Sequence, residues 1–174
     1  MKEAIRVVLV DDQELYREGN ALLLDATDDI VVVGEADTGE EALHAIAEAE
    51  PDIVLMDILM PGMGGIDATR RIVSAHPDIR VIVLTIFDLD EYAFGALDAG
   101  ASAFILKSSS PEALIRTVRI VASGKAVVEP RITRQLIDMY TRRIIPMPET
   151  DSEKEEPRRD IDSLSPRERE VFYA

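Results

Sequence analysis

Five short runs of β-branched and other apolar residues alternate with helix-like segments along the first 125 residues of the chain. The runs are apolar on both faces, which is typical of strands that are covered by helices on each side. The predicted strands are residues 5–10, 30–36, 52–57, 80–85 and 103–107, and the predicted helices lie near 13–27, 39–49, 65–76, 90–99 and 111–124. This order predicts an α/β fold with a doubly wound, five-stranded parallel sheet.

The helix-like segments carry residues that usually mark the ends of helices. Thr38, followed three residues later by Glu41, fits a capping box, and Pro111 fits the first turn of a helix. Gly100 and Gly124 fit helix carboxyl ends. A (β/α)₈ barrel would need roughly twice the length of this segment, so an open sheet is the better interpretation.

The character of the sequence changes after residue 125. We expect a linker over residues 126–162, with one amphipathic helix near 130–144 as a carboxyl-terminal helical extension. Residues 163–174 begin another helix, with Ser165 as the amino-terminal cap, Pro166 at the first position and Glu168 three residues after the cap. A well-capped helix with nothing to pack against predicts that the chain stops inside a second domain.

The composition excludes several kinds of protein. A formal net charge of −15 argues against nucleic-acid binding by bulk electrostatics, and the absence of cysteine excludes disulfides and thiolate metal sites. No apolar run could span a bilayer and the amino terminus shows no cleavable signal, so we expect a cytoplasmic protein without a membrane partner. Nucleotide-binding loops and the GxSxG motif of serine hydrolases are also absent.

Polar residues stand at the carboxyl ends of four predicted strands. They are Asp11 and Asp12 after the first strand, Asp57 at the end of the third, Thr85 at the end of the fourth and Lys107 at the end of the fifth. The carboxyl ends of parallel strands share one edge of the sheet, and ligands of open α/β folds bind at that edge. The sequence therefore places carboxylates, a hydroxyl and an ammonium on one rim.

Clustered carboxylates repel one another and need a positive partner. A few carboxylates with water and phosphate oxygens suit Mg²⁺ better than Ca²⁺, and we expect Asp11 and Asp12 to hold it. Asp57, alone at the end of a central strand, is the best candidate for a nucleophile that forms an acyl phosphate. Lys107 and Thr85 would then stabilise the charge of the transferred phosphoryl group.

Each of these residues also has an ordinary interpretation when it is taken alone. An aspartate at a strand end usually caps a helix or lies in a loop, and a single lysine or threonine usually has no chemical role. If each residue had only its ordinary role, chance alone would have placed all of them at one edge of the sheet. A shared site is therefore the better interpretation.

Residues 5–125 resemble the receiver domain of two-component response regulators. The matching stretches are VLVDDQELYREG, PDIVLMDILMPGMGGID, VIVLT and DAGASAFILK, with the pattern D-x-x-M-P-x-x-x-G from Asp57 to Gly65. The resemblance implies the flavodoxin-like strand order 2-1-3-4-5. It also implies that Asp57 is the phosphoacceptor for a sensor histidine kinase. Asp12 would bind Mg²⁺ directly and Asp11 largely through water, while Asp57 and the backbone carbonyl of Leu59 would complete the protein ligands.

The same resemblance implies how a signal would leave the site. Thr85 would move toward the phosphoryl group, and the aromatic residue three positions before the lysine, Phe104, would respond. Phe104 has no hydroxyl group, so it can switch only by packing. The chain would then be a signalling protein that assists its own phosphorylation and dephosphorylation, not an enzyme.

The last residues, LSPREREVFYA, look like the opening of a LuxR-type helix-turn-helix domain. Together with a receiver and a linker, they indicate the NarL/FixJ class of transcription factors. The helix that would read the major groove is missing from this sequence, so we expect DNA binding by the full-length protein but no specific binding by this chain. We also expect a homodimer on phosphorylation.

Two positions depart from the family's usual pattern. The residue after the family's threonine, here Thr85, is often small, but in this chain it is Ile86. We hypothesise that Ile86 and Leu59 shield a phosphoaspartate from water. The family's lysine is frequently followed by proline in a cis peptide bond, but Ser108 follows Lys107 here. A cis bond at a residue other than proline would cost a few kcal/mol, which argues against that geometry.

Two other kinds of function use similar residues. A phosphatase of the haloacid-dehalogenase type also uses a doubly wound sheet, Mg²⁺ and an acyl phosphate, but such proteins usually carry a DxD motif that MDILM lacks. A receiver that acts only through protein contacts is the second alternative, and the start of a helix-turn-helix domain argues against it.

Overall fold

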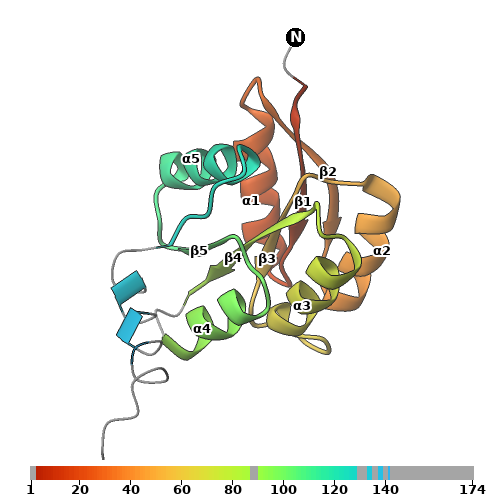
Figure 1. The fold of residues 1–174 in the computed structure, drawn as a ribbon. Coiled ribbons are helices and arrows are strands. Elements are labelled where there is room, and N and C mark those ends of the chain that lie inside the picture. The colour runs from red at the N-terminus through yellow and green to blue at the C-terminus, as the bar shows by residue number, and fades with distance from the viewer. Residues whose placement is uncertain (1–2, 87–89, 129–132, 135–136, 139–140, 142–174) are drawn as a thin grey trace, which may run out of the picture. The chain divides into compact units, whose positions relative to one another are not determined.

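The computed structural model describes residues 3–86, 90–128, 133–134, 137–138 and 141, and Figure 1 presents the fold. Strands and helices alternate along the chain as the sequence predicts. The strands are β1 (Ile5–Val10), β2 (Ile30–Ala36), β3 (Ile53–Asp57), β4 (Arg80–Thr85) and β5 (Ala103–Leu106). The helices are α1 (Glu14–Asp25), α2 (Gly39–Ala49), α3 (Gly65–Ala75), α4 (Asp90–Asp98) and α5 (Pro111–Ala122).

The five strands form one parallel sheet in the order β2-β1-β3-β4-β5. This order confirms the predicted flavodoxin-like receiver fold. The pairing of β1 with β2 shifts register between Val7 and Val8, so β2 carries one extra residue there, while β1 pairs regularly with β3. The two acid-bearing strands, β1 and β3, are therefore direct neighbours in the middle of the sheet.

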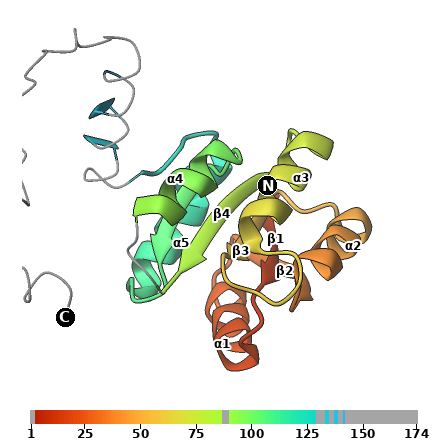
Figure 2. The same cartoon turned by 90° about the horizontal axis from the view of Figure 1, so that it is seen from below.

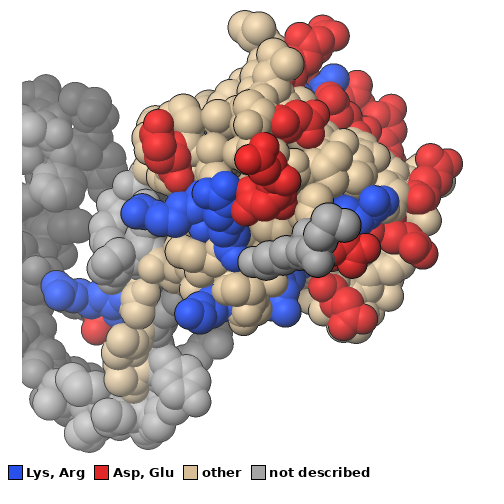
Figure 3. Space-filling view, turned by 90° about the horizontal axis from the view of Figure 1, so that it is seen from above, with Lys and Arg blue, Asp and Glu red and all other residues tan. Residues whose placement is uncertain are grey.

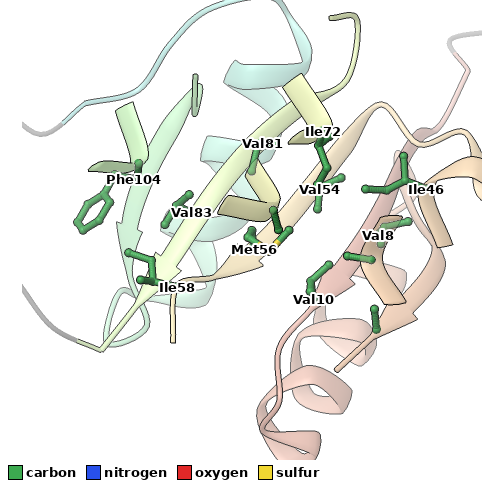
Figure 4. Close-up of a cluster of buried hydrophobic side chains, with 14 of the residues drawn as sticks. Val8, Val10, Ile46, Val54, Met56, Ile58, Ile72, Val81, Val83 and Phe104 are labelled. Carbon is green, nitrogen blue, oxygen red and sulfur yellow. The ribbon is translucent and has the colours of Figure 1, made fainter. Parts of the chain in front are cut away.

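Helices cover both faces of the sheet, which explains why the strands are apolar on both sides. Figure 1 shows α1 and α5 on one side of the sheet and α2, α3 and α4 on the other, and Figure 2 gives the view from below. On the second side, Ile46 of α2 and Ile72 of α3 are buried against Val8, Val54 and other strand side chains drawn in Figure 4. Because β3 is buried along its whole length, its last residue is buried as well.

Most of the predicted helix ends are confirmed, and one differs in detail. Pro111 opens α5, and Gly100 and Gly124 adopt φ values of +99° and +90° after their helices. Thr38 caps α2 by accepting a hydrogen bond from the Glu41 backbone N–H. The reciprocal bond goes from the Asp37 backbone N–H to the Glu41 carboxylate, one residue before the position that a capping box uses.

The extension after α5 is described only in part. The backbone N–H of Val127 donates to the carbonyl of Ser102, and Val127 forms a bridge with Ala103 at the edge of the sheet. Within the predicted helix 130–144, Thr133, Arg134, Ile137, Asp138 and Thr141 are helical and the other positions lie outside the described residues. Residues 142–174 also lie outside them, so the domain limits 1–125, 126–162 and 163–174 stay predictions. None of the helices that the structure describes is long and apolar enough to cross a membrane.

Gly65 and Gly19 give a matched test of the packing that positions β3. A Cβ atom at residue 65 would clash with the carbonyl oxygen of Asp57, whereas a Cβ atom at residue 19 in α1 would meet nothing within 4 Å. We expect Gly65→Ala to lower the free energy of unfolding by about 3 kcal/mol or to prevent folding. Gly19→Ala should raise it by roughly 0.5–1 kcal/mol, because alanine is the better helix former.

Urea unfolding followed by circular dichroism measures both changes. Equal midpoints for Gly65→Ala and the unsubstituted protein would contradict the close approach of α3 to the end of β3.

Candidate functional site

Three carboxylates meet at the carboxyl edge of the sheet, as the sequence predicts. Carboxylate oxygens of Asp11, Asp12 and Asp57 all lie within 4.8 Å of one another. Asp11 and Asp57 are buried, with 3% and 4% of their surface exposed, while Asp12 is exposed. Such a cluster in a neutral solution needs a cation beside it, and the described structure supplies one in the side chain of Lys107.

Lys107 lies between the two buried carboxylates. Its Nζ atom is 2.6 Å from Asp11 Oδ2 and 3.1 Å from Asp57 Oδ2, and its side chain is only 4% exposed. The backbone N–H of Lys107 donates to the carbonyl of Thr85 over 2.7 Å, so the lysine is tied to the end of β4 as well. The peptide bonds of the described residues are all trans, in agreement with the argument against a cis bond before Ser108.

Asp11 is held from several sides. Its Oδ1 accepts a hydrogen bond from the Gln13 backbone N–H at 2.9 Å, and its carbonyl accepts one from Arg17 Nη1 at 2.6 Å. Arg17 is itself paired with Glu35 at 3.0 Å. Asp11 Oδ2 is paired with the Lys107 ammonium at 2.6 Å, so both oxygens of this buried carboxylate have a partner.

Asp57 is positioned by the turn that follows it. The backbone N–H of Gly65 donates to the carbonyl of Ile58 at 2.9 Å, which brings the start of α3 directly against the end of β3. The loop between them is held by Glu40 of α2, whose carboxylate accepts a hydrogen bond from the Met63 backbone N–H at 3.0 Å. Gly62 in this loop has a φ of +74°, a conformation that favours glycine.

Burial and the neighbouring charges shift two pKa values in the site. Burial raises the pKa of Asp57, and the nearby Asp11 acts in the same direction, while Lys107 and the Leu59 backbone lower it by a smaller amount. Burial alone would lower the pKa of Lys107, but its contacts with Asp11 and Asp57 outweigh burial, so the pKa is raised. Lys107 therefore stays protonated, and the charge of the Asp57 carboxylate is poorly solvated.

Thr85 and Phe104 lie on the same side of the sheet. Thr85 is fully buried and pairs with Leu106, while Phe104 pairs with Val83 two residues earlier in β4. Residues two apart in a strand face the same way, so Thr85 and Phe104 are diagonal neighbours on the face covered by α4. Phe104 is 4% exposed and belongs to the core cluster with Val83, as Figure 4 shows.

Leu59 and Ile86 follow β3 and β4 at the same edge. Leu59 is 42% exposed and Ile86 is 58% exposed. Both residues put exposed apolar surface at the edge of the sheet that carries the acidic cluster, where a lid is predicted.

The residues present fit a hard divalent cation such as Mg²⁺. Carboxylate oxygens are its preferred protein ligands, and the cluster offers one oxygen from each of three aspartates. Asp12 is exposed and takes part in no ion pair among the described residues, so its carboxylate is available to a cation. A cation bound here would also offset the repulsion between the carboxylates.

Tyr16 is a member of the site that sequence reasoning missed. Lys107 Nζ lies 4.5 Å from the centroid of the Tyr16 ring. An aromatic residue in the first turn of the helix after the acid pair is the only signal in the sequence, and that signal does not say which strand the ring reaches.

A cavity lies at the amino-terminal edge of the sheet, opposite the acidic cluster. It has a volume of about 580 Å³ and is lined by residues that include Arg6, Arg80, Arg119, Asp29, Asp52 and Asp78. Figure 3 views the molecule from this side and shows basic and acidic side chains mixed together. Arg119 forms a two-pronged pair with Asp29 at 2.8 and 2.9 Å, and this mixture of charges does not single out a ligand.

The comparisons with known proteins agree with the fold and the acidic edge. The family model described as the response regulator receiver domain matches residues 7–119. The chain belongs to this family.

Several relatives place the chain among two-component response regulators of the NarL/LuxR type. The response regulator GacA of Pseudomonas viridiflava is 41% identical over 132 residues, which cover 76% of this chain and 62% of that protein. The transcriptional regulatory protein DegU of Brevibacillus brevis is 39% identical over 138 residues, which cover 79% and 58%. The chain thus spans about three fifths of the length of these curated relatives.

Solved structures give the same result. A two-component response regulator of the LuxR family from Aurantimonas sp. SI85-9A1 matches with a TM-score of 0.72 and 34% identity, over 80% of this chain and 99% of that one. The receiver domain of the putative response regulator NarL from Mycobacterium tuberculosis matches with a TM-score of 0.68 and 36% identity, over 71% and 99%. The described part of the chain is thus the receiver domain of a response regulator.

The raised pKa of Asp57 predicts that this carboxylate lowers the stability of the metal-free protein. A carboxyl group whose pKa is raised by folding loses part of its contribution to stability as the pH rises through the folded-state pKa. Asp57→Asn keeps the shape of the side chain and removes the charge. We therefore expect it to have a higher thermal midpoint than the unsubstituted protein at neutral pH in EDTA, with the difference shrinking toward pH 4.

Adding Mg²⁺ supplies the control, because it should raise the midpoint of the unsubstituted protein more than that of Asp57→Asn. A lower midpoint for Asp57→Asn at every pH would show that its ion pair with Lys107 outweighs its burial.

Proposed function

We propose that this chain is a phosphorylation switch: it accepts a phosphoryl group on Asp57 from a sensor histidine kinase, with Mg²⁺, and so controls a DNA-binding transcription output. The observation that carries the proposal is the buried Asp57 carboxylate with Lys107 Nζ at 3.1 Å and two further acids beside it. Burying a carboxylate without a partner is unfavourable for folding free energy, and clusters of buried titratable groups are typical of functional sites.

The transfer itself needs few protein groups. An Asp57 oxygen attacks the phosphorus of a phosphohistidine, the phosphorus–nitrogen bond breaks, and the imidazole leaves with the electron pair and takes up a proton. The product is an acyl phosphate on Asp57. Lys107, now close to Asp57 Oδ2, is placed to pair with a phosphoryl oxygen with only a small movement.

The acidic residues have a second task in this proposal. Asp12, Asp57 and the backbone carbonyl of Leu59 would hold Mg²⁺ directly, with Asp11 acting largely through water, and the ion would supply positive charge beside the transferred group. The exposure of Asp12 and the existing pairing of Asp11 with Lys107 support this division of roles.

The switch would run through Thr85 and Phe104. The Thr85 hydroxyl would donate to a phosphoryl oxygen and draw the end of β4 toward the site. The ring of Phe104, its diagonal neighbour, would then change its packing beneath α4. Such a two-state element needs only local charge to shift its populations.

Family membership supports a signalling role over that of a haloacid-dehalogenase phosphatase. The names of the relatives GacA and DegU describe regulators of response and transcription. The proposal includes a DNA-binding output, a cytoplasmic location and homodimer formation on phosphorylation. A receiver that acts by protein contacts alone is the alternative.

Phosphorylation at Asp57 is the central prediction. With Mg²⁺ and acetyl phosphate, the protein should form one acyl phosphate that hydroxylamine cleaves, and mass spectrometry should place it on Asp57. Asp57→Asn or an excess of EDTA should abolish it. The matched control Asp67→Asn alters an exposed aspartate of α3 and should react normally, since that side chain is 69% exposed and pairs with Arg70.

Light scattering of the same samples, with and without beryllofluoride, tests for the dimer. If Asp57→Asn were phosphorylated as much as the unsubstituted protein, another residue would be the phosphoacceptor. Rapid hydrolysis of phosphate esters would favour the phosphatase alternative.

The lifetime of the acyl phosphate tests the proposed lid. Ile86 exposes apolar surface next to the cluster, so Ile86→Ala should admit water and shorten the half-life by about threefold, equivalent to a small drop in the hydrolysis barrier. Leu22→Ala is the control, because Leu22 is an exposed apolar residue of α1 that lies two turns beyond the site. The half-life follows from release of radioactive phosphate, and an unchanged value for Ile86→Ala would refute the lid.

A further inference from the structure

The ammonium of Lys107 makes two kinds of contact. It is paired with the carboxylates of Asp11 and Asp57, at 2.6 and 3.1 Å. It also lies over the Tyr16 ring, with the ring centroid 4.5 Å from Nζ. This distance and the 4% exposure of the lysine side chain meet the conditions for a cation–π interaction that solvent screens little.

The two kinds of contact respond differently to phosphorylation. The bond to Asp57 must change when that carboxylate becomes part of an acyl phosphate, because its charge moves outward onto the phosphoryl oxygens. The attraction to an aromatic face changes little when the cation shifts slightly over the ring. The ring can therefore support Lys107 both before and after the transfer.

The ring also limits where the lysine can go. A cavity of about 160 Å³ lies between α1 and the start of α5, and its lining includes Tyr16, Asn20, Leu106, Lys107, Ser109 and Leu114. A smaller side chain at position 16 would enlarge this space beside Lys107. The lysine could then swing into it and away from Asp57, since long side chains lose much conformational entropy when they are held.

The orientation of the ring is itself determined by its neighbours. Tyr16 packs against the core cluster on the α1 and α5 side of the sheet, which includes Leu24 and Leu114. The side chain of Asn20, one turn further along α1, lines the same cavity as Tyr16. Lys107 Nζ lies over the ring, so the ring face is the part of Tyr16 that the ammonium contacts.

We propose that Tyr16 is a positioning residue for phosphoryl transfer: its ring holds the Lys107 ammonium beside Asp57 and closes the space into which the lysine would otherwise turn. The proposal rests on the proposed function, because it concerns the efficiency of phosphorylation at Asp57. It assigns the effect to the aromatic face and none of it to the hydroxyl.

The test compares variants that keep or remove the ring. With acetyl phosphate and Mg²⁺, Tyr16→Leu should be phosphorylated about threefold to tenfold more slowly than the unsubstituted protein, as expected for the loss of a partly buried cation–π contact. Tyr16→Phe should stay within about twofold, since it keeps the ring. Leu22→Ala, on the same helix but away from the lysine, should react normally.

A double-mutant cycle separates positioning from a general loss of structure. In a Lys107→Ala background, Tyr16→Leu should slow phosphorylation no further, because the residue acts only through the lysine. If Tyr16→Leu slows the reaction equally with and without Lys107, or if Tyr16→Phe is as slow as Tyr16→Leu, the proposal is wrong. Tyr16→Met, which fills more of the space without an aromatic face, replaces Tyr16→Leu should the latter not fold.

A second measurement does not depend on phosphorylation. Nuclear magnetic resonance of the Lys107 ammonium protons should show an upfield ring-current shift in the unsubstituted protein and in Tyr16→Phe, and its loss in Tyr16→Leu. If the unsubstituted protein takes up no phosphate, the proposed function fails while this shift still reports the contact. If it takes up phosphate and Tyr16→Leu reacts at the same rate, the positioning role alone is refuted.

Discussion

The contact of one buried ammonium with two buried carboxylates is the interaction on which the site depends. Lys107 Nζ lies 2.6 Å from Asp11 Oδ2 and 3.1 Å from Asp57 Oδ2. The backbone N–H of Lys107 also donates a hydrogen bond to the carbonyl of Thr85 at the end of β4. Without the lysine, burial would leave two like charges side by side with little solvent, which is strongly unfavourable. The sheet brings the three residues together because the carboxyl ends of its parallel strands share an edge.

Burial of the Asp57 carboxylate is unfavourable for the fold. Burial outweighs the attraction of Lys107 and leaves the pKa of Asp57 raised. The surrounding structure is built to keep the residue there: β3 is buried throughout, α3 starts against it at a glycine, and Glu40 holds the connecting loop. These contacts hold a poorly solvated carboxylate at the edge of the sheet, which is an arrangement often found at functional sites.

Much of the fold could be predicted from local patterns. Strands 5–10, 30–36 and 80–85 match the structure at both ends, and the helix ends at Pro111, Gly100 and Gly124 are where the sequence puts them. The acidic edge followed from the strand ends, since parallel strands leave no other arrangement. The return bond of the α2 cap was not predictable, because Glu41 reaches Asp37 through a rotamer that the sequence does not specify.

By itself the sequence determined which residues end the strands, and therefore that Asp11, Asp12, Asp57, Thr85 and Lys107 share one rim, because the alternation of apolar runs is a local property. Only the tertiary structure decided that Lys107 pairs with both buried acids and lies over the Tyr16 ring, and that Arg17 donates to the Asp11 carbonyl. The contacts of Lys107 join residues far apart in the chain, and all of these contacts depend on side-chain direction. Packing between α1, β1 and β5 sets that direction, and no spacing in the sequence encodes it.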